Sequence, residues 1–250
     1  MEQYRIQERL GDALYGAVWR ATDLRNPDED VAIKQIDLGK AGKALDLFGK
    51  HLDNPLREHQ TIECIRRAGG HPNVLRVHGV FVANDNMHIV MDLCDGGDLF
   101  GIVQRAPEQR LRESVSLHYF RRIVSAVLFL HEHGIAHRDL SLENVLVRQN
   151  VVKLCDFGLS VRTSTKCSDI VGKAYYMAPE VAAGRSYDPA AADLWSLGIM
   201  LFIMLTGSPM MNSTAPDDAG FQAFRMLGLH TPSWNRGVCL TKCQTRRLIC

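Results

Sequence analysis

The chain has 250 residues, of which 46% are hydrophobic and 23% are charged. A chain of this size can bury one large core, or two small lobes that share a cleft. Its 29 basic and 28 acidic side chains nearly cancel, so no overall field predicts binding to nucleic acid or to an anionic membrane. Seven cysteines without paired spacing indicate reduced thiols, and the N-terminus has no apolar signal core. Composition therefore predicts an intracellular, cytoplasmic protein, with a nuclear location left open.

The first ninety or so residues predict a small antiparallel sheet. Strands are expected at residues 4–10, 17–23, 30–36, 74–81 and 87–93. Each range is rich in β-branched or aromatic residues and is bounded by Gly, Asn, Pro or Asp. One helix is expected over 55–67, because Asn54-Pro55 favours a helix start and Gly69-Gly70 a helix stop.

After Gly96-Gly97 the pattern changes to helix. Helices are expected at 111–133 and 190–205, with a short hairpin formed by 145–147 and 151–154. The apolar run over 194–205 is shorter than the roughly 20 residues that cross a bilayer, so we expect a buried helix and no membrane span. Sheet first and helices second predict two lobes, 1–93 and 94–228, with a hinge near 92–97. Residues 229–250 lack apolar periodicity and contain Cys239, Cys243 and Cys250, so we expect a poorly ordered tail.

Two features of the first lobe indicate phosphate binding. Gly11, Ala13 and Gly16 form a glycine-rich turn between two expected strands, whose backbone N–H groups could lie over phosphates; a hairpin without a ligand is the plain alternative. Lys34 stands on an otherwise apolar strand, which is costly unless its ammonium meets an anion. Glu58 shares a helix face with two isoleucines and is the expected partner, with Glu63 as the alternative.

The strongest signal is His137-Arg138-Asp139, followed by Asn144 and then by Asp156-Phe157-Gly158. The order and separation of these motifs, together with the turn, Lys34 and Ala178-Pro179-Glu180, resemble the protein kinase catalytic domain of the calcium/calmodulin-kinase-like Ser/Thr type. The resemblance covers residues 4 to about 226. It implies an α+β, two-lobed fold with a small antiparallel sheet and one helix in the N-lobe, and a mainly helical C-lobe. We expect that C-lobe to be incomplete, because the pattern thins after Gly207.

The resemblance implies ATP and Mg²⁺ as cofactors. Asp139 would orient the substrate hydroxyl and take its proton, while Asn144 and Asp156 would hold magnesium. Ala13 departs from the pattern, which has a second glycine there. The residues implied in nucleotide binding are Gly11, Ala13, Gly16, Val18, Ala32, Lys34, Met91, Asp92, Cys94, Asp98 and Leu146.

Two positions of the implied active site depart from the kinase pattern as a pair. Ser141 stands where Ser/Thr kinases usually carry a lysine, and Lys173 stands where they carry a threonine after Gly172. The two positions are expected to touch. We expect Lys173 to supply the missing charge and Ser141 the hydroxyl, with a solvent-facing Lys173 as the alternative.

The remaining expectations concern regulation and substrates. Asp169 lies about where kinases carry the phosphorylated residue that activates them, and it is expected to pair with Arg138. Asp98 and Glu143 resemble positions that read an arginine upstream of the target, so protein substrates with Ser or Thr acceptors, some containing arginine, are expected. The rival to an active enzyme is a nucleotide-binding pseudokinase or regulatory module, or an inactive truncated kinase, and the oligomeric state is left open.

Two residue types invite other readings. Cys155 would line the nucleotide site as a target for electrophiles rather than a catalytic group. Of His131, His133 and His137, two are expected to end a helix favourably, in preference to a zinc site.

Overall fold

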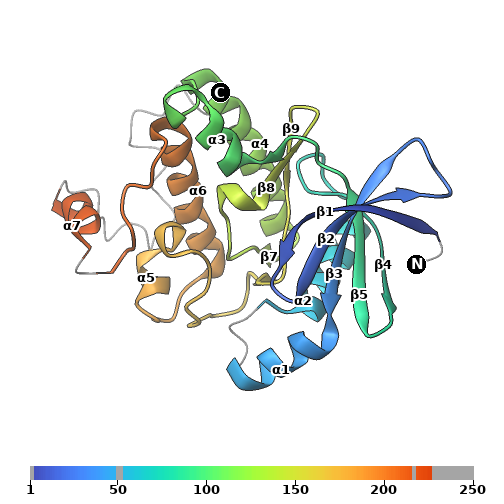
Figure 1. Cartoon of the computed structure of the whole chain (residues 1–250). Helices are drawn as coiled ribbons and strands as arrows, with labels where there is room; N and C mark the ends of the chain where they lie inside the picture. Colours follow the sequence, from blue (N-terminus) through green and yellow to red (C-terminus); the bar gives the residue numbers. More distant parts are fainter. Residues whose placement is uncertain (1–2, 49–52, 216–217, 227–250) are drawn as a thin grey trace.

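The structure is a computed structural model that describes residues 3–48, 53–215 and 218–226. Within these ranges the chain forms a sheet-based lobe and a mainly helical lobe, drawn side by side in Figure 1. The α+β, two-lobed architecture expected from the sequence is therefore confirmed. The expected tail over 229–250, with its three cysteines, lies outside the described residues.

The first lobe is built on one antiparallel sheet with the strand order β1-β2-β3-β5-β4. Its strands are β1 (Tyr4–Ala13), β2 (Gly16–Asp23), β3 (Asp30–Asp37), β4 (Val77–Ala83) and β5 (Asn86–Asp92). A Cβ atom at Gly16 would overlap the carbonyl oxygen of Gln35, so only glycine allows this approach of backbone to backbone. The close contact holds the turn between β1 and β2 against β3, the strand that carries Lys34.

The fourth strand begins at Val77 and not at residue 74. Val74 forms a bridge to Leu154, and the backbone N–H of Leu75 donates to the carbonyl of Leu154 at 2.8 Å. The residues before β4 therefore connect the two lobes instead of lengthening the sheet.

Helix α2 (Pro55–Arg67) occupies the range that the sequence predicts. The side-chain oxygen of Asn54 caps it by accepting from the backbone N–H groups of Leu56 at 3.0 Å and Arg57 at 3.3 Å. This cap fixes where the helix starts and hence which turn presents Glu58.

A second helix, α1 (Leu38–Phe48), corrects the expectation of one helix in this lobe. Gly39 and Gly42 hide it in the sequence, because glycine weakens a helix. A cap and tertiary packing stabilise the helix despite its low intrinsic propensity. Asp37 accepts from the backbone N–H of Lys40 at 2.9 Å, and Ala41 is buried in the core.

The second lobe consists of helices with short strands between them. In chain order its elements are β6 (Gly97–Asp98), α3 (Leu99–Arg105), η2 (Pro107–Gln109), α4 (Glu113–Glu132), β7 (Ile135–Ala136), η3 (Leu142–Asn144), β8 (Val145–Arg148), β9 (Val151–Leu154), β10 (Val161–Arg162), η4 (Ala174–Tyr176), α5 (Pro179–Ala182), α6 (Pro189–Thr206) and α7 (Ala219–Met226). Helices α4 and α6 pack side by side (Figure 1). By length and composition α6 could cross a membrane, but half of its residues are buried in the core, as in the central helix of many globular proteins.

The two lobes share one hydrophobic core. The cluster that contains Ile62 and Ile89 of the first lobe also contains Leu130, Phe157 and Met200 of the second. The segment between β5 and β6, where the sequence predicts a hinge, crosses from one lobe to the other. Residues from both lobes can therefore form one site.

Candidate active site

Lys34 joins two carboxylates from different parts of the chain. Its Nζ donates to both oxygens of Glu58 at 2.9 Å and to Asp156 Oδ1 at 3.2 Å. The expected pairing with Glu58 is present, whereas Glu63 pairs with Arg66. This contact brings β3, α2 and the segment after β9 together at one ammonium group.

The charges of this cluster alter one another's pKa. Burial acts to lower the pKa of Lys34, but the charges of Glu58, Asp156 and Asp53 outweigh it and raise the pKa above its ordinary value. Burial raises the pKa of the Glu58 carboxyl to about 7, an effect that the Lys34 ammonium only partly offsets. For Asp156, burial is opposed mainly by the charge and the hydrogen bond of Lys34, and the pKa falls below its usual value. Lys34 thus stays positive, and Asp156 stays ionised beside it.

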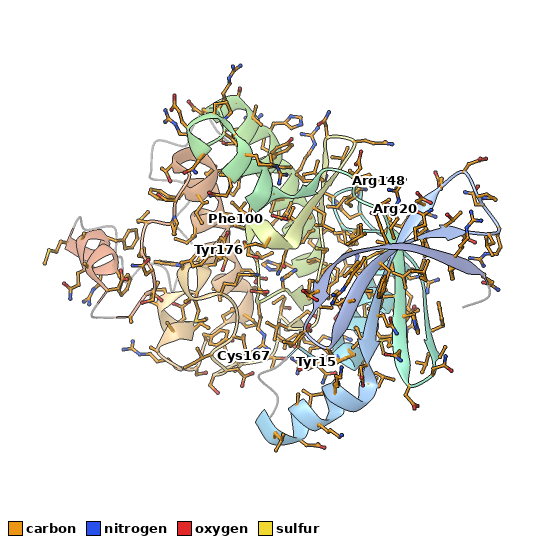
Figure 2. All side chains as sticks on the ribbon, viewed as in Figure 1. Tyr15, Arg20, Phe100, Arg148, Cys167 and Tyr176 are labelled. Atoms are coloured by element: carbon orange, nitrogen blue, oxygen red, sulfur yellow. The ribbon has the colours of Figure 1, made fainter. Side chains whose placement is uncertain are left out.

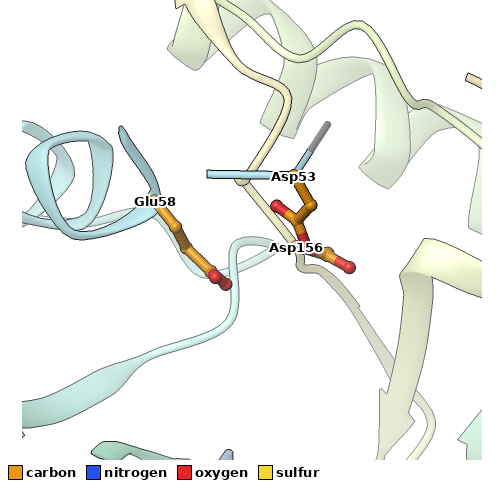
Figure 3. A group of neighbouring side chains, drawn as sticks. All are labelled: Asp53, Glu58 and Asp156. Atoms are coloured by element: carbon orange, nitrogen blue, oxygen red, sulfur yellow. The ribbon is translucent and has the colours of Figure 1, made fainter. Parts of the chain in front are cut away.

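Asp53 is a third carboxylate in this cluster, and the sequence analysis missed it. One oxygen each of Asp53, Glu58 and Asp156 lie within 4.8 Å of one another (Figure 3). Within the described part of the chain, Asp53 Oδ1 is buried and has no hydrogen-bond partner. A Cβ atom at Gly158 would overlap this oxygen, so Asp53 packs directly on the glycine of Asp156-Phe157-Gly158. Burial raises the pKa of Asp53.

The segment around Asp139 is held in place by a buried carboxylate on α6. Asp193 accepts from the backbone N–H groups of His137 and Arg138, both at 2.8 Å. Arg138 has a φ of 65°, a conformation that persists only when its surroundings impose it. His131 Nε2 also lies 2.8 Å from Asp193, so this histidine contacts the carboxylate that holds the loop.

Asp139 lies between Asn144 and Lys173. Asn144 Nδ2 donates to the carbonyl and to Oδ2 of Asp139, both at 2.8 Å. Lys173 Nζ lies 3.5 Å from the same Oδ2 and donates to Ser141 Oγ at 2.9 Å. Ser141 and Lys173 thus touch, as expected, and the alternative of a solvent-facing Lys173 is not what the structure shows.

Arg138 connects this loop to the segment that precedes Lys173. Its Nη1 donates to Asp169 Oδ2 at 3.1 Å and to the hydroxyl of Tyr187 at 3.3 Å. The Arg138 side chain is 1% exposed and that of Asp169 29%, so loss of Asp169 would leave a buried guanidinium without this partner. The pairing of Arg138 with Asp169 expected from the sequence is present.

Two carboxylates expected to read a substrate already have partners within the chain. Asp98 Oδ1 accepts from the backbone N–H of Gly101 at 2.7 Å and caps α3. Glu143 accepts from the hydroxyls of Tyr175 at 3.1 Å and Tyr176 at 3.0 Å. The tyrosine contacts are a second feature that the sequence analysis missed.

Strand pairing places the implied nucleotide-binding residues in three groups. Gly11 and Val18 are paired across the first hairpin, Ala32 and Met91 across β3 and β5, and Asp98 and Leu146 across β6 and β8. Of the others, Ala13 and Gly16 close the first hairpin, and Asp92 and Cys94 follow Met91. A separate hollow of about 430 Å³, lined by residues that include Tyr15, Gly16, Trp19, Gln35 and Asp37, lies on the first lobe and does not include Lys34 or Asp156.

The thiols near this region are poorly ionised. Burial raises the pKa of Cys94 to about 11, and it raises the pKa of Cys155 well above its ordinary value. Because the thiolate is the reactive form, Cys155 is a poorer target for electrophiles than the sequence analysis expects.

The lobes, the ion pairs of Lys34 and the loop around Asp139 define a known class of domain. The sequence pattern of the protein kinase domain matches residues 4–236, and the chain belongs to this family. It is similar to CBL-interacting protein kinase 2 of Oryza sativa subsp. japonica, with 36% identity over 213 residues that cover 83% of this chain and 45% of the relative. CBL-interacting serine/threonine-protein kinase 7 of Arabidopsis thaliana is 34% identical over 238 residues, covering 93% and 52%. NUAK family SNF1-like kinase 1 of Mus musculus is 34% identical over 209 residues, covering 82% and 30%. The chain spans about half the length of the two plant relatives.

Proposed function

We propose that this chain transfers the γ-phosphoryl group of ATP to serine or threonine hydroxyls of protein substrates. The observation that carries the proposal is the position of Asp139, which contacts Asn144 on one side and Lys173 on the other. A carboxylate in this setting can orient a hydroxyl and take its proton. The new O–P bond forms as the bond between the γ-phosphorus and the bridging oxygen of ADP breaks, and the proton passes to Asp139. The names of the two relatives from Arabidopsis and rice support the same class of reaction.

The donor atoms present fit magnesium and a nucleotide. Asn144 Nδ2 is used by Asp139, which leaves its Oδ1 as a ligand, and Asp156 offers a carboxylate. Hard oxygen ligands of this kind suit Mg²⁺. Bound Mg²⁺ would offset the negative charge of the phosphates. Lys34 is proposed to meet phosphate oxygens, and its contact with Glu58 supports this by fixing where the ammonium lies.

Lys173 is proposed to replace the lysine that is absent at Ser141. Its ammonium lies 2.9 Å from Ser141 Oγ and 3.5 Å from Asp139, so it brings a positive charge next to the side chain of residue 141. An ammonium beside the transferred group stabilises the charge that it carries in the transition state. The catalytic set proposed is thus Asp139, Lys34, Glu58, Ser141 and Lys173.

We also propose that the segment before Lys173 is held without phosphorylation. The ion pair of the buried Arg138 with Asp169 supports this, because a carboxylate takes the place that a phosphate would need. The residues proposed to bind the nucleotide are Gly11, Ala13, Gly16, Val18, Ala32, Lys34, Met91, Asp92, Cys94, Asp98 and Leu146. An intracellular location is proposed on the four described cysteines, which are all free.

The rival function, a regulatory module that binds nucleotide without transferring phosphate, is favoured by one feature. Ser141 stands where Ser/Thr kinases usually carry a lysine, and loss of that charge would weaken phosphate transfer without preventing nucleotide binding. The two functions differ in whether phosphate reaches an acceptor.

Phosphate transfer from labelled ATP to a panel of serine peptides separates them. The wild-type chain is compared with Asp156→Asn and with Asp46→Asn, a matched control at an exposed aspartate of α1. Transfer that is lost only in Asp156→Asn supports the enzyme. Thermal stabilisation by ATP and Mg²⁺ without any transfer supports the rival.

A further inference from the structure

Glu143 lies in a small cluster with two tyrosines that follow Lys173. Each of its oxygens accepts one phenol hydroxyl, that of Tyr175 at 3.1 Å and that of Tyr176 at 3.0 Å. The tyrosine rings pack on each other with centroids 4.7 Å apart. Because Glu143 is two residues from Ser141, the cluster lies close to the place where the hydroxyl would react.

The two tyrosines have different surroundings. Tyr176 is 2% exposed, its hydroxyl also accepts from the backbone N–H of Leu142 at 3.2 Å, and its carbonyl accepts from Ser196 at 2.9 Å. It is therefore part of the core of the second lobe, in the position labelled in Figure 2. Tyr175 is only partly buried, and Glu143 is the one partner that its hydroxyl has within the described part of the chain.

The hydroxyl of Tyr175 remains a donor at neutral pH. Burial and the charge of Glu143 raise its pKa to about 12, so the phenol keeps its proton. A hydrogen bond to a charged group is stronger than one between neutral groups. A guanidinium that approaches Glu143 must compete with this bond and with that of Tyr176 for the same two oxygens.

Asp98, the other carboxylate expected to read an arginine, is also engaged. Its Oδ1 caps α3 by accepting from the backbone N–H of Gly101, and loss of such a cap destabilises a helix. One oxygen of Asp98 and both oxygens of Glu143 thus already accept a hydrogen bond, with which an incoming guanidinium must compete.

We infer that Tyr175 is a specificity-determining residue, and that its contact with Glu143 makes the site indifferent to an arginine upstream of the target hydroxyl. This inference rests on the proposed function, because it concerns the choice among serine and threonine substrates. It replaces the arginine preference expected from Asp98 and Glu143.

The test uses serine peptides that are identical except for a single arginine or alanine, placed in turn at each position before the serine. The ratio of kcat/KM for the arginine and alanine peptides is measured for the wild-type chain, Tyr175→Phe and Tyr175→Phe with Glu143→Gln. Tyr4→Phe is the matched control, since it removes a hydroxyl that contacts Arg25 in the other lobe. A ratio within one sample does not depend on the fraction of chain that is folded.

We expect a ratio of about one for the wild type and for Tyr4→Phe. Tyr175→Phe should gain an arginine preference of about tenfold, and Glu143→Gln should remove that gain. A preference of about tenfold or more in the wild type, or no gain in Tyr175→Phe, overturns the inference.

A binding measurement separates this inference from the proposed function. The same peptides carry a fluorophore, and their Kd values are measured by anisotropy with a non-hydrolysable ATP analogue present. If no variant transfers phosphate but Tyr175→Phe gains affinity for arginine peptides, the proposed function fails and the inference stands. If Tyr175→Phe changes neither the kcat/KM ratio nor the Kd ratio of the arginine and alanine peptides, the inference fails, whether or not the chain transfers phosphate.

Discussion

The surroundings of Lys34 and of Asp139 differ in how the chain supplies their charges. At Lys34, the ammonium and its partner Glu58 come from the positions that helical spacing and the kinase pattern both indicate. At Asp139, the ammonium comes from Lys173, 34 positions further along the chain, and Ser141 provides a hydroxyl in return. On the proposed role of Lys173, the charge keeps its place in space while its place in the sequence changes.

The largest effect is expected from Asp139→Asn, which tests whether the group formed by Asp139, Ser141 and Lys173 performs the chemistry. The amide can still accept from Asn144 but cannot take a proton, so the rate of transfer should fall by about 10²–10⁴. Single-turnover transfer from ATP to a serine peptide measures this rate, with thermal unfolding as a check on folding. An unchanged rate would mean that Asp139 is not the base.

The contacts of α2 show how far the sequence could be used. Both ends of this helix were predictable, because Asn54-Pro55 and Gly69-Gly70 act locally. The pairing of Lys34 with Glu58 followed from the helix phase. The contact of Ser141 with Lys173 was expected from the paired departure, through the resemblance to kinases.

Other features could not be predicted, because they depend on packing between distant segments. Helix α1 is held by Asp37 and by burial of Ala41, against the low helix propensity of its glycines. Asp53 meets Gly158, more than a hundred residues later, and no local pattern marks it. Tyr175 stands three residues before Ala178-Pro179-Glu180, and no local pattern links it to Glu143.

A smaller effect is expected at Lys34, where Glu58→Gln removes the ion pair between Lys34 and Glu58. Loss of one partner of a buried ion pair costs about 3 kcal/mol, and Asp156 remains to hold part of the charge of Lys34. Urea unfolding gives the free energy of unfolding. Glu63→Gln on the same helix is the matched control, since its exposed pair with Arg66 should contribute less than about 1 kcal/mol. Equal losses for the two variants would show that Lys34 and Glu58 are no more coupled than a surface pair.

The smallest effect concerns the two thiols near Lys34 and Asp156, those of Cys94 and Cys155. Because burial raises the pKa of Cys94 to about 11, against an ordinary 9.0, the thiolate fraction at pH 8 should be lower by roughly a hundredfold. Cys155, which adjoins Asp156, should react slowly for the same reason. Alkylation by iodoacetamide, followed by peptide mass mapping, measures each rate in the folded chain and in urea. Equal alkylation rates in the folded chain and in urea would show that Cys94 and Cys155 are open to water in the folded chain.

The central claim is that Lys173 supplies the ammonium that position 141 lacks. The most direct test is the single-turnover rate of four chains: wild type, Lys173→Met, Ser141→Lys, and the double variant. Loss of the ammonium should lower the rate by about 10²–10³, and Ser141→Lys should restore part of it in the Lys173→Met background. A Lys173→Met chain that transfers phosphate at the wild-type rate would contradict the account, as would a double variant no faster than Lys173→Met alone.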